Sequence, residues 1–374
     1  MPANPSRVRV AGPVVVLLSF VILGLPDYAH GVAWPTMRAD LHRPLADLGT
    51  FLAVQSAGYL AVATLMGRLT GRWGLDRVIR ASGLSCVVGL GLVAVAPGWL
   101  VVLAGSLLLG FGSGGMDTGF NAAIALRNDG RLMGLLHAGY GIGAGLGPVV
   151  VGATLAADVG WRSAYVILSV ATLVVVLGLA GRQLSTEATT PHEPPGSPRG
   201  VLLPCLAFFV YVALEVTAGV WAFTYLTEHR GLGDLAASAW VGAYWVGLTA
   251  GRLWLGVRGH EQEATRLLGV SMAMAVGAAA VLWLGGPLVP LGLPLAGVAL
   301  STVFPILMLV TPARVGEERA AAAVGWQAAA GSVGSAAGPA AAGLVLDHAG
   351  VDAYGPVVLA MAVALSVTVA ALRR

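Results

Sequence analysis

Three carboxylates lie in stretches of the sequence that are otherwise apolar and long enough to cross a lipid bilayer. They are Asp27, Asp117 and Glu215. A charged group at the centre of a membrane costs about 2.5–3.5 kcal/mol on insertion scales, so such a residue is a candidate for ion or substrate binding. Asp27 and Glu215 each precede a Gly-Val pair by the same spacing, Gly31-Val32 and Gly219-Val220. An acidic residue repeated in two similar halves is typical of an internally duplicated transporter.

The surroundings of the carboxylates suggest different roles. Asp27 follows Pro26, which removes one helical hydrogen bond and opens the backbone around a substrate-binding carboxylate. Asp117 and Asn121 share one helix face, and burial disfavours the ionised form of a carboxylate, so Asp117 is the candidate for proton coupling and Asn121 for substrate. The alternatives are a helix-end charge for Asp27 and a structural hydrogen bond between helices for Asp117.

The apolar stretches contain further polar and aromatic side chains that are candidates for substrate binding. Buried amides and imidazoles donate and accept hydrogen bonds, and aromatic rings stack on sugars. The same residues can also serve as packing residues, hydrogen bonds between helices or anchors at the membrane surface. With Glu215, the additional substrate-binding candidates are Gln55, His137, Tyr140, Trp221 and Gln327.

The composition excludes most other classes of protein. Of 374 residues, 57% are apolar and only 10% are charged, with a mean hydropathy of +0.82, which indicates an integral membrane protein. The basic residues are scattered and form no nucleic-acid patch. There is no Lys, hence no phosphate-binding loop, and no zinc or nucleophile motif stands out. We therefore expect that the protein is not an enzyme and holds no metal or cofactor. We also expect a monomer whose partners are a small-molecule substrate, protons and lipid.

The pattern of apolar segments predicts an all-α integral membrane protein with twelve transmembrane helices in two pseudo-symmetric bundles of six. The expected spans are 12–34, 46–67, 77–96, 99–124, 132–157, 162–181, 201–227, 236–256, 265–285, 288–311, 319–345 and 353–372. They group into an N-terminal bundle (1–181), a Pro-rich flexible cytoplasmic linker (182–200) and a C-terminal bundle (201–374).

Arginine distribution predicts the orientation. Placing both termini in the cytoplasm puts 17 of the 21 basic residues, Arg252 among them, on the cytoplasmic side of a cell (inner) membrane, as the positive-inside rule requires. The halves also share motifs: Gly67-Arg68-Leu69 matches Gly251-Arg252-Leu253, and Gly147-Pro148 matches Gly338-Pro339. Repeats of this kind place a substrate site between the two bundles, near the membrane midplane.

The segment between the second and third spans is similar to the cytoplasmic loop signature of the major facilitator superfamily. It runs from Gly67 to Arg77, and Gly71 stands where the family usually has an acidic residue. The resemblance implies alternating access between two bundles and a conformational-switch loop made of Gly67, Arg68, Arg72, Gly74, Asp76 and Arg77.

Within that superfamily the chain most resembles the fucose permeases, which are sugar:proton symporters. The match lies in Asp27 with Pro35, Gln55 with Gly58-Tyr59, Asp117-Thr118 with Asn121, and the segment from Gly141 to Pro148. It implies that Asp27 binds sugar hydroxyls and that Asp117 takes the proton. The departures are Asp rather than Glu at 117, and His137 and Tyr140 in place of amides.

These observations predict a proton-coupled carrier of a small polar solute, with a sugar as the favoured substrate. The main alternative is a proton-antiport exporter of drugs or metabolites from the same superfamily, which would have an apolar cavity. A membrane enzyme would need a nucleophile or a metal-ligand cluster.

Overall fold

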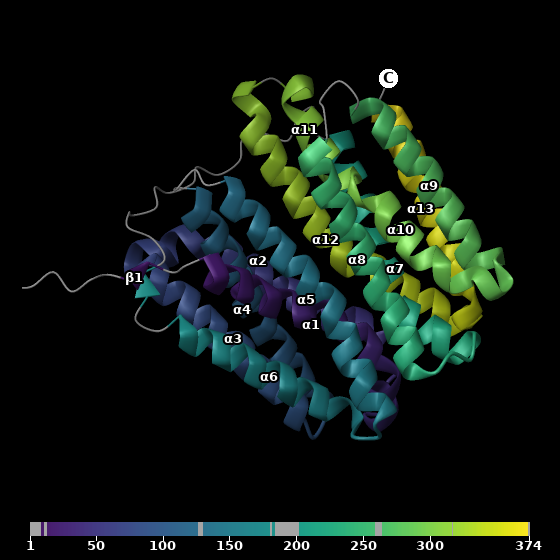
Figure 1. Cartoon of the computed structure of the whole chain (residues 1–374), viewed down its shortest axis with the longest axis horizontal. Coiled ribbons are helices and arrows are strands. Elements are labelled where there is room, and N and C mark those ends of the chain that lie inside the picture. The colour runs from purple at the N-terminus through teal and green to yellow at the C-terminus, as the bar shows by residue number, and fades with distance from the viewer. Residues whose placement is uncertain are drawn as a thin grey trace, which may run out of the picture.

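The described part of the chain forms two groups of helices (Figure 1). The computed structural model describes residues 9–10, 13–125, 130–179, 182–183, 202–258, 264–315 and 317–372. In the first group α1 packs along α5, while α2 and α3 pack against α4. This group comprises α1 Pro13–Asp40, α2 Asp47–Trp73, α3 Leu75–Val95, α4 Trp99–Ala125, α5 Gly130–Ala156 and α6 Gly160–Gly178.

The second group repeats this arrangement with more interruptions. There α7 packs along α12 and α13, and α8 packs along α10. The group comprises α7 Leu202–Thr224, the π-helical turn η1 Tyr225–His229, α8 Asp234–Arg258, α9 Ala264–Leu284, the 3-10 turn η3 Gly286–Leu291, α10 Gly292–Ser301, α11 Val303–Val315, α12 Glu317–Ala349, the 3-10 turn η4 Val351–Ala353 and α13 Tyr354–Leu372.

The helices account for the twelve predicted spans. Among the described residues, eleven segments are long and apolar enough to cross a membrane. The twelfth, α8, has 25 residues and carries Asp234 and Arg252, which lower its hydropathy. The span predicted over 288–311 is not one continuous helix in the structure: the helix breaks between α10 and α11. Pro305 explains the break, since it has no N–H to donate to the carbonyl of Ser301.

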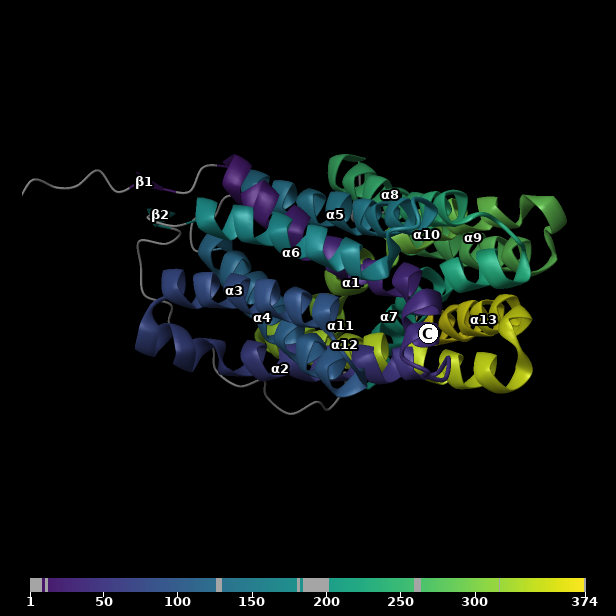
Figure 2. The same ribbon diagram turned by 90° about the horizontal axis from the view of Figure 1, so that it is seen from below.

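The halves meet where glycines let their backbones approach closely. Figure 2 shows α5 beside α8, and α2 also packs against α12. In the contact of α1 with α7, a side chain at Gly31 would collide with the backbone of Val220. In the contact of α5 with α8, Gly145 faces Gly242. Small residues are the usual means of close helix packing in membranes.

Polar contacts between the two halves close the end of the molecule at which α1 ends. Arg38, near the end of α1, forms an ion pair with Glu228 of η1 at 2.9 Å. The backbone N–H of Leu45, between α1 and α2, donates to Asp347 near the end of α12 at 3.0 Å. Both contacts join the two halves, and both lie where α1 ends. We call this the closed end.

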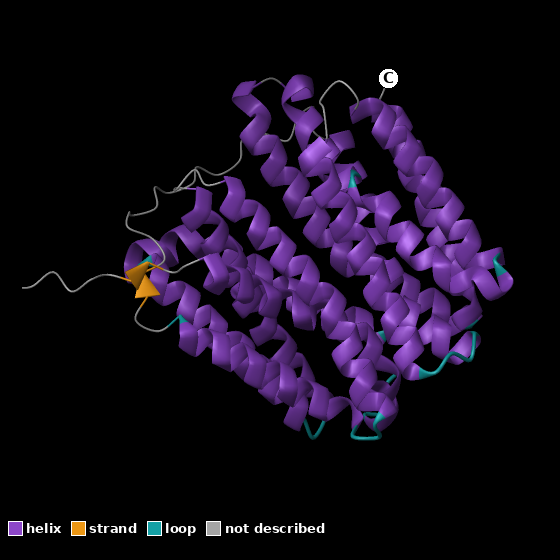
Figure 3. Cartoon of the chain, in the orientation of Figure 1, coloured by secondary structure: helices purple, strands orange, loops and turns teal. Residues whose placement is uncertain are grey.

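A short pair of parallel strands lies at the opposite end (Figure 3). Residues Arg9–Val10 (β1) pair with Arg182–Gln183 (β2). The first two residues of the predicted linker are therefore paired rather than free. The remainder of that linker lies outside the described residues.

Candidate functional site

A cavity of about 330 Å³, lined by both polar and apolar side chains, lies between the two groups of helices. All three predicted carboxylates lie in or next to its wall. Phe20, Leu23 and Asp27 of α1 line it, so it extends from the level of Asp27 toward the end where α1 begins. The other lining residues are Tyr28, Leu52, Gln55, Ser56, Tyr59, Ser113, Asp117, Tyr140, Val216, Arg252, Ser332 and Ser335.

Asp27 joins three helices of the first half. Tyr140 of α5 donates its hydroxyl to Asp27 Oδ2 at 2.8 Å, and Gln55 Nε2 of α2 donates to Oδ1 at 3.3 Å. The structure therefore brings together three residues that the sequence singled out separately. A carboxylate has room for further hydrogen bonds, so Asp27 can still accept one from a ligand in the cavity.

Asp117 forms a second polar centre on the same wall. Tyr59 of α2 donates to Asp117 Oδ2 at 2.5 Å, and Asn121 Nδ2 donates to Oδ1 at 2.8 Å. Asp117 lines the cavity, whereas Asn121 does not and lies one turn further along α4. Asn121 thus contacts the carboxylate rather than the cavity.

Glycines of α4 hold this second centre in place. A Cβ at Gly110 would collide with the carbonyl of Gln55, and one at Gly114 would meet the backbone of Tyr59. Without side chains at these positions α4 lies against α2, which brings Tyr59 within reach of Asp117.

We expect Gly110→Val to destabilise the protein, because overpacking a tight contact costs about 1–3 kcal/mol. The measurement is the midpoint of thermal unfolding in detergent. Gly91→Val in α3 is the matched control, since the nearest atom to its Cβ, Ser169 Oγ, is 3.9 Å away. Equal midpoints for the two variants would contradict this packing argument.

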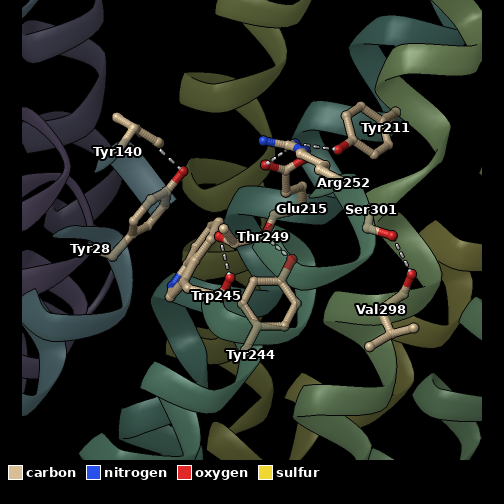
Figure 4. A network of polar contacts seen from close by, with 10 residues as sticks. All are labelled: Tyr28, Tyr140, Tyr211, Glu215, Tyr244, Trp245, Thr249, Arg252, Val298 and Ser301. Atoms are coloured by element: carbon tan, nitrogen blue, oxygen red, sulfur yellow. Dashed lines mark hydrogen bonds and ion pairs between the residues drawn. The ribbon is translucent and has the colours of Figure 1, made fainter. Parts of the chain in front are cut away.

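The opposite wall carries Arg252 of α8 (Figure 4). Its Nη2 donates to both carboxylate oxygens of Glu215, at 3.2 and 3.3 Å, and to the hydroxyl of Tyr211 at 3.0 Å. Glu215 is only 8% exposed and lies behind Arg252, outside the cavity lining. The sequence placed Arg252 at the cytoplasmic edge. Arg252 instead lines the cavity, whereas Arg68, the arginine that matches it in the repeat, is exposed.

An aromatic stack closes the cavity toward the closed end. The rings of Tyr28 in α1 and Trp245 in α8 are stacked, with centroids 3.3 Å apart, and thus join the two halves (Figure 4). Tyr28 follows Asp27 in the sequence, and its hydroxyl lies 3.5 Å from that of Tyr140. Tyr28 and Tyr59 were not among the predicted site residues, and each had one signal in the sequence. Tyr28 adjoins Asp27, and Tyr59 lies one helical turn after Gln55.

Three predicted substrate residues lie elsewhere or cannot be placed. Trp221 is fully buried and donates to the carbonyl of Pro339 at 3.0 Å, in the contact between α7 and α12. Gln327 is also fully buried and accepts from Thr311 at 3.0 Å. Neither lines the cavity. His137 lies in α5, but its side chain is outside the described residues.

Only one residue of the predicted switch loop, Gly74, lies between α2 and α3, at the end opposite the closed end. The others are helical: Gly67, Arg68 and Arg72 lie in α2, and Asp76 and Arg77 lie in α3. Gly74 has φ +79°, a conformation that favours glycine, and it ends α2. Gly67, Arg68, Arg72 and Arg77 are exposed, and Asp76 is half-buried. The described residues contain no cluster of three or more His, Cys, Asp or Glu that could hold a metal ion.

The chain is similar to known proteins over most of its length. The profile of the Major Facilitator Superfamily matches residues 16–339. "Bypass of stop codon protein 6" of Saccharomyces cerevisiae is 28% identical over 65% of this chain and 56% of its own length. A hexuronate transporter of Bacillus subtilis is 23% identical over 63% of each chain. The chain thus spans less than two thirds of either relative.

A solved structure has the same fold. A bacterial homologue of the human lysosomal transporter Spinster superposes with a TM-score of 0.73 at 14% identity, covering 96% of this chain and 94% of that one. Two bundles of helices around a central cavity, together with the profile match over most of the sequence, lead to one conclusion: the chain is a multi-pass membrane protein that belongs to the Major Facilitator Superfamily.

Proposed function

We propose that the protein is a proton-coupled carrier that moves a small polar, sugar-like solute by alternating access. The observation that carries this proposal is the single cavity in which Asp27 and Asp117 face Arg252 across the two halves. Beside the apolar side chains of Phe20, Leu23, Leu52 and Val216, the cavity has carboxylates, an arginine and serine hydroxyls that can hydrogen-bond a polar solute. The resemblance to fucose permeases and the similarity to a hexuronate transporter support a sugar-like substrate.

In this proposal, Asp117 carries the proton. It has a hydroxyl partner, Tyr59, and an amide partner, Asn121, that orient the carboxyl group in either protonation state. Asp27, with Gln55 and Tyr140, binds the solute from the first half. Because protonation and solute binding occur in one cavity, both can stabilise the same conformation. Movement of the proton across the membrane is thereby coupled to movement of the solute.

The arginine distribution favours cytoplasmic termini, and with that orientation the cavity faces the cytoplasm. The closed end, with Arg38–Glu228 and Leu45–Asp347, then faces the outside, and the Tyr28–Trp245 stack lies between it and the cavity. The structure would correspond to the inward-facing state of the cycle. The alternate state requires these contacts to break and the halves to meet at the end near β1 and β2.

Proteoliposome uptake tests the proposal directly. Labelled neutral and acidic sugars and cationic dyes are offered under an imposed pH gradient. Uptake of a sugar that collapses when a protonophore removes the gradient supports the proposal. Expulsion of dye with no uptake of sugar would instead favour the exporter alternative.

We expect Glu228→Gln to shift the balance of conformations only slightly. The two side chains of the Arg38–Glu228 pair are 29% and 32% exposed, and such pairs contribute about 0.2–1 kcal/mol. Distances between spin labels across the closed end measure the shift toward the opened form. Arg162→Gln is the control, because its partner Asp40 lies in the same half; an equal shift in both variants would refute a role for the pair in closure.

A further inference from the structure

Arg252 is the one basic residue in the described lining of the cavity. Its side chain is 34% exposed although it lies among membrane-spanning helices. A guanidinium is always charged and costs free energy to hold at membrane depth. Glu215 offsets this charge, but Arg252 and not Glu215 lines the cavity, where a ligand can reach the guanidinium.

The contact with Glu215 leaves most of the guanidinium unused. All three hydrogen bonds of Arg252 come from Nη2, and the two to the carboxylate are 3.2 and 3.3 Å long. A strong bidentate pair uses two nitrogens at about 2.7–2.9 Å. Nη1 forms no hydrogen bond with the described residues, whereas Nε is buried and has no partner among them. Arg252 is therefore held in place but retains N–H donors for another acid.

Surrounding residues fix the direction of the group. Phe304 lies 5.7 Å from the guanidinium carbon, and Tyr211 accepts from Nη2 on the side away from the first half. Figure 4 shows the other end of the guanidinium directed toward Tyr28 and Tyr140. The Nη1 donors thus face the cavity, while Nε stays buried.

The opposite wall limits the charge of the ligand. Asp27 and Asp117 would repel an anion placed near them, so an acidic group is stable only on the side of α8. A dianion such as a phosphate monoester would meet two carboxylates and a single arginine. A monocarboxylate with hydroxyl groups at its other end fits better, because its hydroxyls can donate to Asp27.

We propose that the substrate is a hydroxylated monocarboxylic acid, such as a sugar acid, whose carboxylate binds Arg252 while Glu215 positions that arginine. This inference rests on the proposed function and specifies the substrate class of the same cavity. Serine hydroxyls at Ser332 and Ser335 of α12, on the wall shared with Arg252, provide further polar contacts.

The test is binding of D-glucuronate, D-glucose and D-glucosamine to purified protein in detergent. Binding is measured as the shift that each compound causes in the midpoint of thermal unfolding. We expect glucuronate to stabilise the protein and the other two not to. Arg252→Gln should weaken glucuronate binding by about tenfold to a hundredfold, the value of a lost charged hydrogen bond. Arg266→Gln, an exposed arginine in α9, is the matched control and should bind as the unaltered protein does.

Arg252→Gln leaves Glu215 without its arginine, so the double variant Glu215→Gln/Arg252→Gln is included in case the single one does not fold. It should fold and still fail to bind glucuronate. Glucuronate binding of unaltered strength in either folded Arg252 variant, or a preference for glucose, would overturn the inference. The binding assay needs no proton gradient, so it is independent of the uptake assay: pH-driven glucose uptake would uphold the proposed function while overturning this inference.

Discussion

Asp117→Asn should abolish accumulation of the substrate against its gradient while leaving exchange of substrate across the membrane. The amide still accepts from Tyr59 and has nearly the same volume, but it cannot bind or release a proton. One pH unit is worth about 1.4 kcal/mol per proton, so a carrier that couples one proton accumulates up to about tenfold. The variant should only equilibrate the substrate across the membrane, without accumulating it.

Proteoliposomes loaded with unlabelled substrate measure exchange, and those with an imposed pH gradient measure accumulation. Tyr59→Phe is the matched control, because it removes the 2.5 Å hydrogen bond but keeps the carboxyl group, and it should still accumulate substrate. Normal accumulation by Asp117→Asn would rule out Asp117 as the proton carrier.

Gly145→Trp should stop transport almost completely by preventing closure of the two halves at the closed end. Gly145 in α5 faces Gly242 and Val246 in α8, where there is no room for an indole ring. The protein should still fold, since each half retains its own packing, but it should rest in the alternate conformation.

The measurement is labelling of Leu45→Cys by a membrane-impermeant maleimide, in a background where Cys86 and Cys205 are replaced. Leu45 is buried and its backbone N–H donates to Asp347 across the closed end, so opening should speed its labelling. Gly277→Trp is the control: it places the same ring on α9, where nothing lies within 4 Å of the added Cβ. Unchanged labelling in Gly145→Trp would contradict closure through this contact.

The architecture was predictable because a membrane imposes simple constraints. Long apolar segments must become helices, and a repeated motif such as Gly147-Pro148 and Gly338-Pro339 indicates two related bundles. The break at Ser301 was not predicted, although Pro305 was visible. Its cause is local, but whether a proline bends or ends a helix depends on packing that the sequence does not describe.

The candidate site was predictable in part. Asp27, Gln55, Tyr140 and Asp117 stood out because each is polar in an apolar segment, and all four line the cavity. Arg252 was missed because charge counting treats arginines near helix ends alike. A long side chain can point back into the protein to reach a buried acid, and only the fold shows that Glu215 lies within its reach.

The pairing of Glu215 with Arg252 has an electrical consequence. Both residues belong to the same half and offset each other's charge, so reorienting the C-terminal half moves almost no net charge through the membrane. A full charge moved through 100 mV corresponds to about 2.3 kcal/mol. Membrane voltage would then act only on the proton, the first half's carboxylates and the solute. An acid carried with one proton adds no net charge, so its uptake would follow the pH gradient even at zero voltage.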